Sequence, residues 1–155
     1  MLHPHEFIKK IAPAAQERYK RTGIYASCTI AQAALESGWG KTVPQDMKTK
    51  KYSYNLFGIK GEGPAGYVEC PHEEFIKGKK VKQMAKFRCY HNYEESIADN
   101  ERILMLDRYK PFREAATADE AAHQLYKCGY ATDPRYGQKL ISIMKQYRLY
   151  DYDID

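Results

Sequence analysis

One short β-rich stretch lies between two helical regions, and this order is the strongest constraint on the fold. Phe75, Ile76 and Val81 flank Lys77-Gly78-Lys79, a turn that contains glycine, so a hairpin is expected over Tyr67–Met84. Apolar residues on both sides of this stretch recur at helical spacing instead. The sequence therefore predicts an α+β domain that is predominantly helical and carries one small β lobe.

Apolar periodicity and capping residues predict the helices. The first covers His5–Arg21, is kinked or restarted at Pro13, and ends at Gly23. The second begins at the N-cap Ser27, continues to Glu36 and stops at Gly38. Later helices are expected over Tyr93–Leu106, over Thr117–Cys128 with Gly129 as the stop, and from Asp133-Pro134 through Tyr147, followed by a frayed acidic tail, Asp151–Asp155.

The stretch Lys41–Gly66, between the second helix and the hairpin, is rich in glycine, lysine and tyrosine and is expected to be irregular. Irregular segments of this length in compact domains usually have a function. Helices, then a β element, then helices is the layout of a lysozyme-like domain, in which a cleft separates a helical lobe from a β lobe.

The run Ala33–Gly40 places one carboxylate, Glu36, at the end of an apolar helical segment, directly before Ser37, Gly38 and the single tryptophan Trp39. A carboxylate there loses hydration and faces the negative end of the helix dipole, and both effects disfavour its charged form. A carboxylic acid that stays protonated near neutral pH is what a general acid needs to cleave a glycosidic bond.

The 155 residues suit one domain, 1–155, with one core. The net charge of +5 favours polyanions, but the clusters at residues 48–51 and 77–82 lack the arginine-rich, aromatic-interleaved pattern of a nucleic-acid motif. No apolar run is long enough to span a membrane. The charges in residues 1–10 exclude a signal peptide there, so export uses another route or a signal was removed.

The four cysteines, Cys28, Cys70, Cys89 and Cys128, are far apart in the sequence. Without a Cys-x-x-Cys pair they do not indicate a zinc site, and the histidines are scattered, so neither a metal nor another cofactor is expected. Three full disulfide pairings and free thiols all stay open.

Five motifs carry a resemblance to one family, and they occur in the family's order over nearly the whole chain. They are Ala33–Gly40, Asn55–Gly61, Phe87–Tyr90, Glu95–Asp99 and Gly129–Tyr136. On these residues the chain resembles the glucosaminidase domains of glycoside hydrolase family 73, which includes flagellar rod-associated peptidoglycan hydrolases, autolysins and phage lysins.

The resemblance implies a lysozyme-like fold and hydrolysis of β-1,4 bonds after N-acetylglucosamine in peptidoglycan, with Glu36 as the catalytic acid. It also implies action at the bacterial cell wall, where a secreted, periplasmic or phage-delivered enzyme meets the glycan strands. A monomer is expected.

A second carboxylate is expected on the hairpin. The family often has Thr-x-Glu-Tyr there, and His72-Glu73-Glu74-Phe75 corresponds to it, which gives Glu74 the glutamate position. His72 and Phe75 depart from the pattern, so Glu73, Glu69 and Glu62 compete, and a solvated hairpin carboxylate is the alternative. Glu73 and Glu74 point to opposite faces of an extended strand, so only one of them can face the cleft.

Aromatic and amide side chains complete the expected site. Tyr130 matches a tyrosine near the family's catalytic centre, with a core tyrosine as the alternative. Trp39 either packs behind Glu36 or stacks on sugar, and Tyr136 lies in the apolar stripe of the last helix. The expected substrate-binding residues are Trp39, Tyr54, Asn55, Phe57 and Tyr136.

Three other functions remain as alternatives. A lytic transglycosylase or muramidase shares the fold and the single glutamate, but Gly129–Pro134 favours the glucosaminidase. An inert wall-binding module would not need a buried acid, and a nucleic-acid-binding protein is suggested by charge alone. Whether the second carboxylate steadies charge or activates water, and whether the substrate's acetamido oxygen is the nucleophile, is left open.

Overall fold

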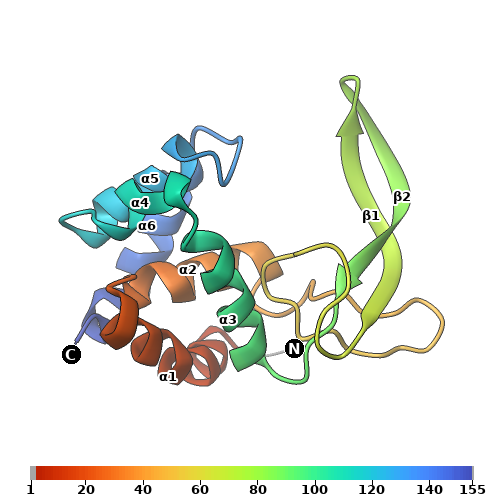
Figure 1. Cartoon of the computed structure of the whole chain (residues 1–155), viewed down its shortest axis with the longest axis horizontal. Helices are drawn as coiled ribbons and strands as arrows, with labels where there is room; N and C mark the ends of the chain where they lie inside the picture. Colours follow the sequence, from red (N-terminus) through yellow and green to blue (C-terminus); the bar gives the residue numbers. More distant parts are fainter. Residues whose placement is uncertain (1–2, 155) are drawn as a thin grey trace.

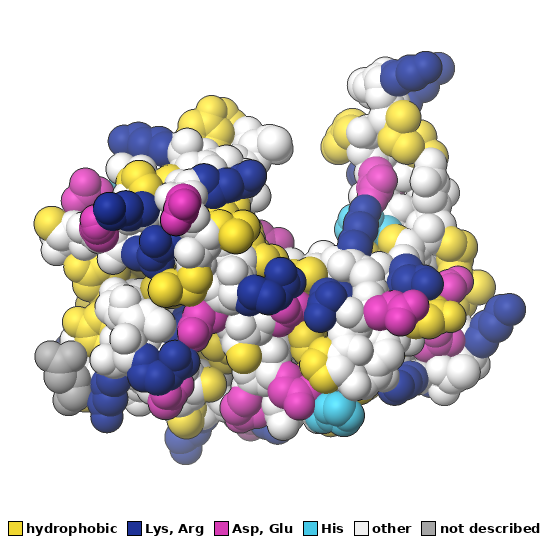
Figure 2. All heavy atoms as spheres, viewed as in Figure 1, with side chains coloured by type: hydrophobic (Ala, Val, Ile, Leu, Met, Phe, Trp, Pro, Cys, Tyr) yellow, Lys and Arg dark blue, Asp and Glu magenta, His cyan; other side chains and the backbone are white. Residues whose placement is uncertain are grey.

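The structure, a computed structural model, describes residues 3–154 as a helical body from which one β-hairpin stands out (Figure 1). The body contains α1 (Pro4–Thr22), α2 (Ala26–Ser37), α3 (Tyr93–Leu104), η1 (Asp107–Tyr109), α4 (Lys110–Arg113), α5 (Ala118–Lys127), α6 (Tyr136–Gln146) and η2 (Leu149–Tyr152). The hairpin is formed by β1 (Tyr67–Ile76) and β2 (Lys79–Arg88). The predicted fold class is confirmed, and the surface is hollowed between body and hairpin (Figure 2).

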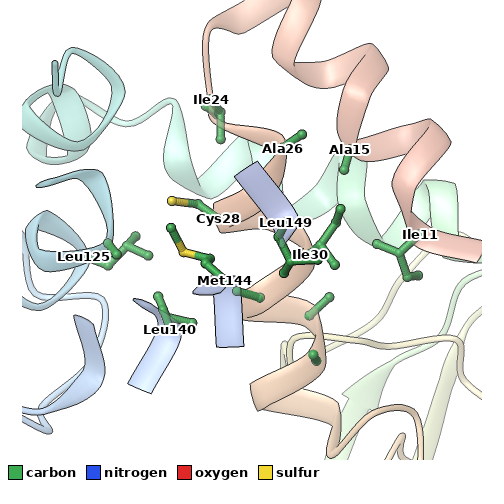
Figure 3. Packing of buried hydrophobic residues seen from close by; sticks show 14 of the residues in the cluster. Ile11, Ala15, Ile24, Ala26, Cys28, Ile30, Leu125, Leu140, Met144 and Leu149 are labelled. Atoms are coloured by element: carbon green, nitrogen blue, oxygen red, sulfur yellow. The ribbon is translucent and has the colours of Figure 1, made fainter. Parts of the chain in front are cut away.

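Helix α2 lies in the middle of the body and is buried on nearly all sides. Its many small residues let the neighbouring helices approach closely, and a helix that is apolar all round belongs in an interior. Figure 3 shows Cys28 and Ile30 of α2 among Ile11 of α1, Met144 of α6 and Leu149 of η2. The helix that ends near Glu36 is therefore held from several directions.

A buried arginine also ties α2 to its neighbours. The guanidinium of Arg18 in α1 donates to Thr29 Oγ1 of α2 at 2.6 Å and to Asn100 Oδ1 of α3 at 2.7 Å. Burial lowers the pKa of Arg18 to about 10, which leaves the group charged at neutral pH. These charge-assisted hydrogen bonds fix three helices against one another.

The start of α2 differs from the prediction. Its N-cap is Tyr25, and Ser27 lies inside the helix. The Ser27 backbone N–H and Oγ donate to the carboxylate of Asp153 at 2.8 and 2.6 Å. The prediction of a frayed tail is therefore wrong for residues 151–153. The first N–H groups of a helix lack partners within the helix, so they attract a carboxylate such as that of Asp153. Asp155 lies outside the described residues.

Other helix boundaries follow local signals more closely. α1 continues through Pro13 without a restart, and Gly23 and Gly38 end α1 and α2 in the left-handed conformation, as predicted. α6 begins at Tyr136 rather than at Pro134, because the carboxylate of Asp133 accepts from the Arg135 N–H in a turn before the helix. The elements η1 and α4 were not predicted.

The two strands pair in antiparallel register from Tyr67 with Arg88 to Ile76 with Lys79. The hairpin is longer than expected, since β2 continues past Met84 to Arg88. Its loop is Lys77-Gly78, and both residues have positive φ angles, 51° and 77°. Two-residue loops of this kind match the twist of the strands. The preceding segment, residues 41–66, is irregular, as predicted.

Candidate active site

A cleft of about 320 Å³ lies between the end of α2 and the base of the hairpin. In Figure 2 the molecular surface is hollowed between the helical body and the hairpin. The cleft is lined by Glu36, Thr42, Pro44, Asn55, Phe57, Gly58, His72 and Phe87. The chain thus brings its predicted acid into a groove whose opposite wall is the β lobe.

Glu36 lies at the end of α2, where the left-handed Gly38 stops the helix, and its side chain is exposed to the cleft. Burial raises the pKa of Glu36, and a hydrogen bond from Tyr136 opposes the rise. The negative end of the α2 dipole also disfavours the charged carboxylate. A protonated carboxyl in this cleft can donate a proton to a bound oxygen.

The hydroxyl bonded to Glu36 belongs to Tyr136. Tyr136 Oη donates to Glu36 Oε1 at 2.9 Å and accepts a hydrogen bond from Gln32 Nε2 at 3.2 Å. The ring of Tyr130 lies 6.1 Å from that of Tyr136, and burial together with the charge of Glu36 raises the pKa of Tyr130. Tyr130 therefore supports the ring that contacts the acid.

Two of the predicted substrate-binding residues line the cleft. Asn55 is buried, and its amide donates to the carbonyls of Ile59 and Arg88 at 2.8 and 2.9 Å, which ties the irregular segment to the hairpin base. Phe57 contributes an apolar wall nearby. A single amide thus both shapes the loop and borders the groove.

Tyr54 and Trp39 are not among the described residues that line the cleft. Tyr54 packs edge-on against Tyr93, with ring centroids 5.2 Å apart. Trp39 packs edge-on against Phe7, with ring centroids 5.7 Å apart, and at a tilt against Tyr147, with ring centroids 4.8 Å apart. Trp39 thus anchors the end of α2 against α1 and the end of α6.

The two neighbouring carboxylates of β1, Glu73 and Glu74, lie on opposite faces of the hairpin. Glu74 and the cleft-lining His72 share one face because they are two residues apart in β1. Lys60 forms an ion pair with Glu74 and lowers its pKa, so the carboxylate is ionised at neutral pH. Glu73 points to the other face and pairs with Lys80 at 3.2 Å.

The remaining competitors also lie elsewhere. Glu69 is an exposed residue on the same face of β1 as Glu73, and Glu62 lies 3.6 Å from the Lys86 ammonium. Of the four candidates, Glu74 alone shares a strand face with His72.

Sequence reasoning missed several site residues. Gln32 lies four residues before Glu36 on α2, so helical spacing alone places it one turn away on the same side. His72 was seen only as a departure from a motif, although it precedes Glu74 by two positions on the strand. Thr42 and Pro44 lie in the irregular segment, where no periodicity marks them.

Within residues 3–154, no group of three or more His, Cys, Asp or Glu side chains is arranged to hold a metal ion. Cys28, Cys70, Cys89 and Cys128 are all free thiols. No helix in the described part of the chain has the length and apolar character needed to cross a membrane.

Comparison with known proteins places this arrangement in a family. A family model described as glucosaminidase, mannosyl-glycoprotein endo-beta-N-acetylglucosaminidase, matches residues 12–149. The exo-glucosaminidase LytG of Bacillus subtilis is 38% identical over 153 residues, which are 95% of this chain and 52% of that protein. The chain thus spans about half the length of this relative.

Solved structures share the fold. The catalytic domain of the autolysin Auto from Listeria monocytogenes superposes with a TM-score of 0.83 at 35% identity, over 96% of this chain and 86% of that one. A truncated glycoside hydrolase domain of FlgJ from Salmonella typhimurium gives 0.78 at 35% identity, over 94% and 98%. Both support the lysozyme-like fold. The chain therefore belongs to the glucosaminidase family, the relationship to glycoside hydrolase family 73 that its five motifs predict.

Proposed function

We propose that this chain is a peptidoglycan hydrolase that cleaves the β-1,4 bond after N-acetylglucosamine, with Glu36 as the general acid. The observation that carries the proposal is a carboxyl that lines a cleft between two lobes and whose pKa is raised by desolvation. Family membership supports the same reaction. The cell wall of bacteria is the place where such an enzyme meets its substrate.

In the proposed reaction, Glu36 transfers its proton to the glycosidic oxygen while the sugar acquires oxocarbenium character. The electrons of the breaking C–O bond stay on the leaving oxygen. Glu36 becomes a carboxylate, and the Tyr136 hydroxyl, 2.9 Å from Oε1, stabilises that charge.

Glu74 is the proposed second carboxylate. Its ion pair with Lys60 keeps it charged, which suits a group that steadies positive charge or takes a proton from water. The same ion pair occupies the carboxylate, so substrate binding has to loosen Lys60 before Glu74 can act.

The test is a digest of purified peptidoglycan with the wild type and with Glu36→Gln, Glu74→Gln and Glu73→Gln, followed by mass spectrometry of the new ends. We expect Glu36→Gln to lose about 10²- to 10⁴-fold in rate, the usual contribution of a general acid. Glu74→Gln should also lose most activity. Glu73→Gln is the matched control and should keep the wild-type rate, because Glu73 lies on the other strand face.

The products decide between the alternatives. Reducing N-acetylglucosamine ends support the proposal. Reducing N-acetylmuramic acid ends would assign the chain to the muramidases, and anhydro ends would assign it to the lytic transglycosylases. Full activity of Glu36→Gln would refute the mechanism, and a wild type that binds the wall without cleaving it would leave only a binding module.

We also propose that the chain acts as a monomer, since the acid, Tyr136 and the hairpin all come from one chain. Light scattering after gel filtration should give the mass of a single chain. Specific activity that rises with protein concentration would contradict this.

A further inference from the structure

Three side chains form a hydrogen-bonded series behind the acid. Gln32 Nε2 lies 3.2 Å from Tyr136 Oη, which lies 2.9 Å from Glu36 Oε1. Gln32 and Glu36 are one turn apart on α2, and Tyr136 is the first residue of α6. Gln32 is 1% exposed and Tyr136 is 5% exposed, so water does not compete for the bond between them, whereas Glu36 reaches the open cleft.

The chemistry of the groups gives the series a direction. An amide nitrogen only donates hydrogen bonds, so the phenol oxygen accepts from Gln32. The phenol has one hydrogen, which is then free to point at Glu36 Oε1. Because Oε1 accepts this bond, the acid proton of Glu36 resides on Oε2.

We infer that Gln32 is a positioning residue that holds the Tyr136 hydroxyl as a donor to Glu36 and keeps the acid proton on Oε2. This inference rests on the proposed function. As the proton leaves Oε2 for the glycosidic oxygen, the Tyr136 bond becomes charge-assisted and stronger. It therefore favours the transition state over the ground state.

Other groups also face the acid. Tyr130 lies behind Tyr136 on the helical side, and its pKa is raised in part by the charge of Glu36. Across the cleft stand His72 and, further along the same strand face, the Glu74–Lys60 pair. Within residues 3–154 the Gln32 side chain is hydrogen-bonded to Tyr136 and to none of these groups, so changing Gln32 acts on Glu36 through Tyr136.

The test compares Gln32→Met, which keeps the volume and removes the amide, with Tyr136→Phe and the double variant. We expect Gln32→Met to lower kcat about tenfold with KM unchanged, as expected for one member of a buried network. The alkaline limb of the kcat/KM profile should move to higher pH, because Glu36 loses a bond that stabilises its charged form. The double variant should be no worse than Tyr136→Phe.

Carbon NMR of labelled Glu36 gives a second readout that does not depend on turnover, and the Glu36 pKa should rise in both single variants. Ser27→Ala, near the start of the same helix, is the structural control and should leave that pKa unchanged. If the rate losses of Gln32→Met and Tyr136→Phe multiply in the double variant and the Glu36 pKa does not change, Gln32 has only a packing role. If Gln32→Met does not fold, Gln32→Glu replaces it and should lower kcat, because the new carboxylate competes for the phenol hydrogen.

Different results would refute the proposed function and the inference about Gln32. Full activity of Glu36→Gln would end the proposed function. An unmoved Glu36 pKa in an enzyme that still needs Glu36 would end only the inference about Gln32.

A second inference comes from the hairpin tip, residues 75–82. Phe75 is 77% exposed and Ile76 is 39% exposed. Lys80 pairs with Glu73, whereas no ion pair is formed within residues 3–154 by the other tip lysines, Lys77, Lys79 and Lys82. Figure 2 shows lysine or arginine side chains at the end of the hairpin, clear of the body, with hydrophobic atoms just below them.

We propose that this tip binds the carboxylates of the peptide stems that project from the glycan strand, which again presupposes the proposed function. The tip continues the strand whose His72 lines the cleft, and five residues of strand span roughly 17 Å. Stem peptides are anionic and extended, so their negative charge complements the tip lysines and their length allows them to reach the tip from the cleft. Exposed apolar side chains supply a surface for their aliphatic parts.

The experiment compares intact peptidoglycan with glycan strands stripped of their stems by an amidase. Replacement of Lys77, Lys79 and Lys82 by alanine should raise KM about tenfold on intact substrate and leave stripped strands unaffected, because exposed ion pairs are individually weak but additive here. Replacement of Lys9, Lys10 and Lys145 on the helical body by alanine changes the net charge by the same amount and should leave KM unchanged on both substrates. Equal losses on both substrates would overturn the proposal, as would equal losses in both triple variants.

Discussion

At the scale of the residue, two opposed effects set the chemistry of Glu36. Burial raises its pKa, and the hydroxyl of Tyr136 lowers it by stabilising the charged form. The net direction is upward, which suits an acid that has to be protonated before it acts. Such a group costs stability whenever it is ionised in the folded protein.

Glu36→Gln is therefore expected to raise the melting temperature near neutral pH. Because the folded pKa of Glu36 lies above its unfolded value, its stabilising contribution is complete below the unfolded pKa and is lost as pH rises through the folded pKa. The difference in melting temperature between variant and wild type should thus grow from about pH 4 to pH 7. A constant difference across this range, measured by calorimetry, would contradict the account.

At the scale of the element, the start of α2 depends on a residue far along the chain. Ser27→Ala removes the hydroxyl that donates to Asp153 at 2.6 Å, and it leaves a half-buried carboxylate oxygen with one bond fewer. We expect a loss of about 1–2 kcal/mol in the free energy of unfolding. Ser142→Ala is the control, since the exposed Ser142 hydroxyl bonds only to the Gln138 carbonyl of its own helix, and it should change stability by less than about 0.5 kcal/mol.

The stability of the hairpin depends on the conformation of its two-residue loop, Lys77-Gly78. Gly78 has a positive φ and open space around its α-carbon, so Gly78→Ala is penalised by backbone conformation alone, by about 1 kcal/mol. Lys77→Asn should act in the opposite direction, because asparagine before glycine favours this loop. Hydrogen exchange of the β1 and β2 amides should speed up in the first variant and slow down in the second.

The elements that the sequence predicts well are those with local signals. Thr117 accepts from the Glu120 N–H at the start of α5, as its capping pattern indicates, and Gly78 marks the hairpin loop. The start of α2 was wrong because Asp153 satisfies the helix from a distance of 126 positions. No local pattern contains that partner.

The same division holds for the site. The sequence singles out Glu36, which lines the cleft, because its apolar run and the following glycine lie within a few residues. Its contact with Tyr136 spans 100 positions, and helical periodicity alone makes Tyr136 look like a core residue. The roles of Glu36, Glu74, Tyr130 and the substrate-binding residues stay predictions until the variants are measured.

At the scale of the whole molecule, the main core lies in the helical body, and the hairpin carries only a small cluster of its own at Val68, Phe87 and Cys89. Leu140→Ala in the main core should lower the free energy of unfolding by about 2–5 kcal/mol, since the cavity cannot fully close. Leu106→Ala, at a side chain that is 53% exposed, is the matched control and should change it by less than about 0.5 kcal/mol. Chemical denaturation measures both.

The ends of α2 are completed by two segments that come more than ninety residues later in the chain. Asp153 satisfies the first turn of the helix, and Tyr136 contacts the acid at its other end. A chain leaving the ribosome therefore contains Glu36 long before it contains the residues that hold both ends of α2. Only after α6 and η2 have docked do Glu36 and the first turn of α2 have their partners, so on the proposed mechanism a chain that stops before α6 should bind glycan without cleaving it.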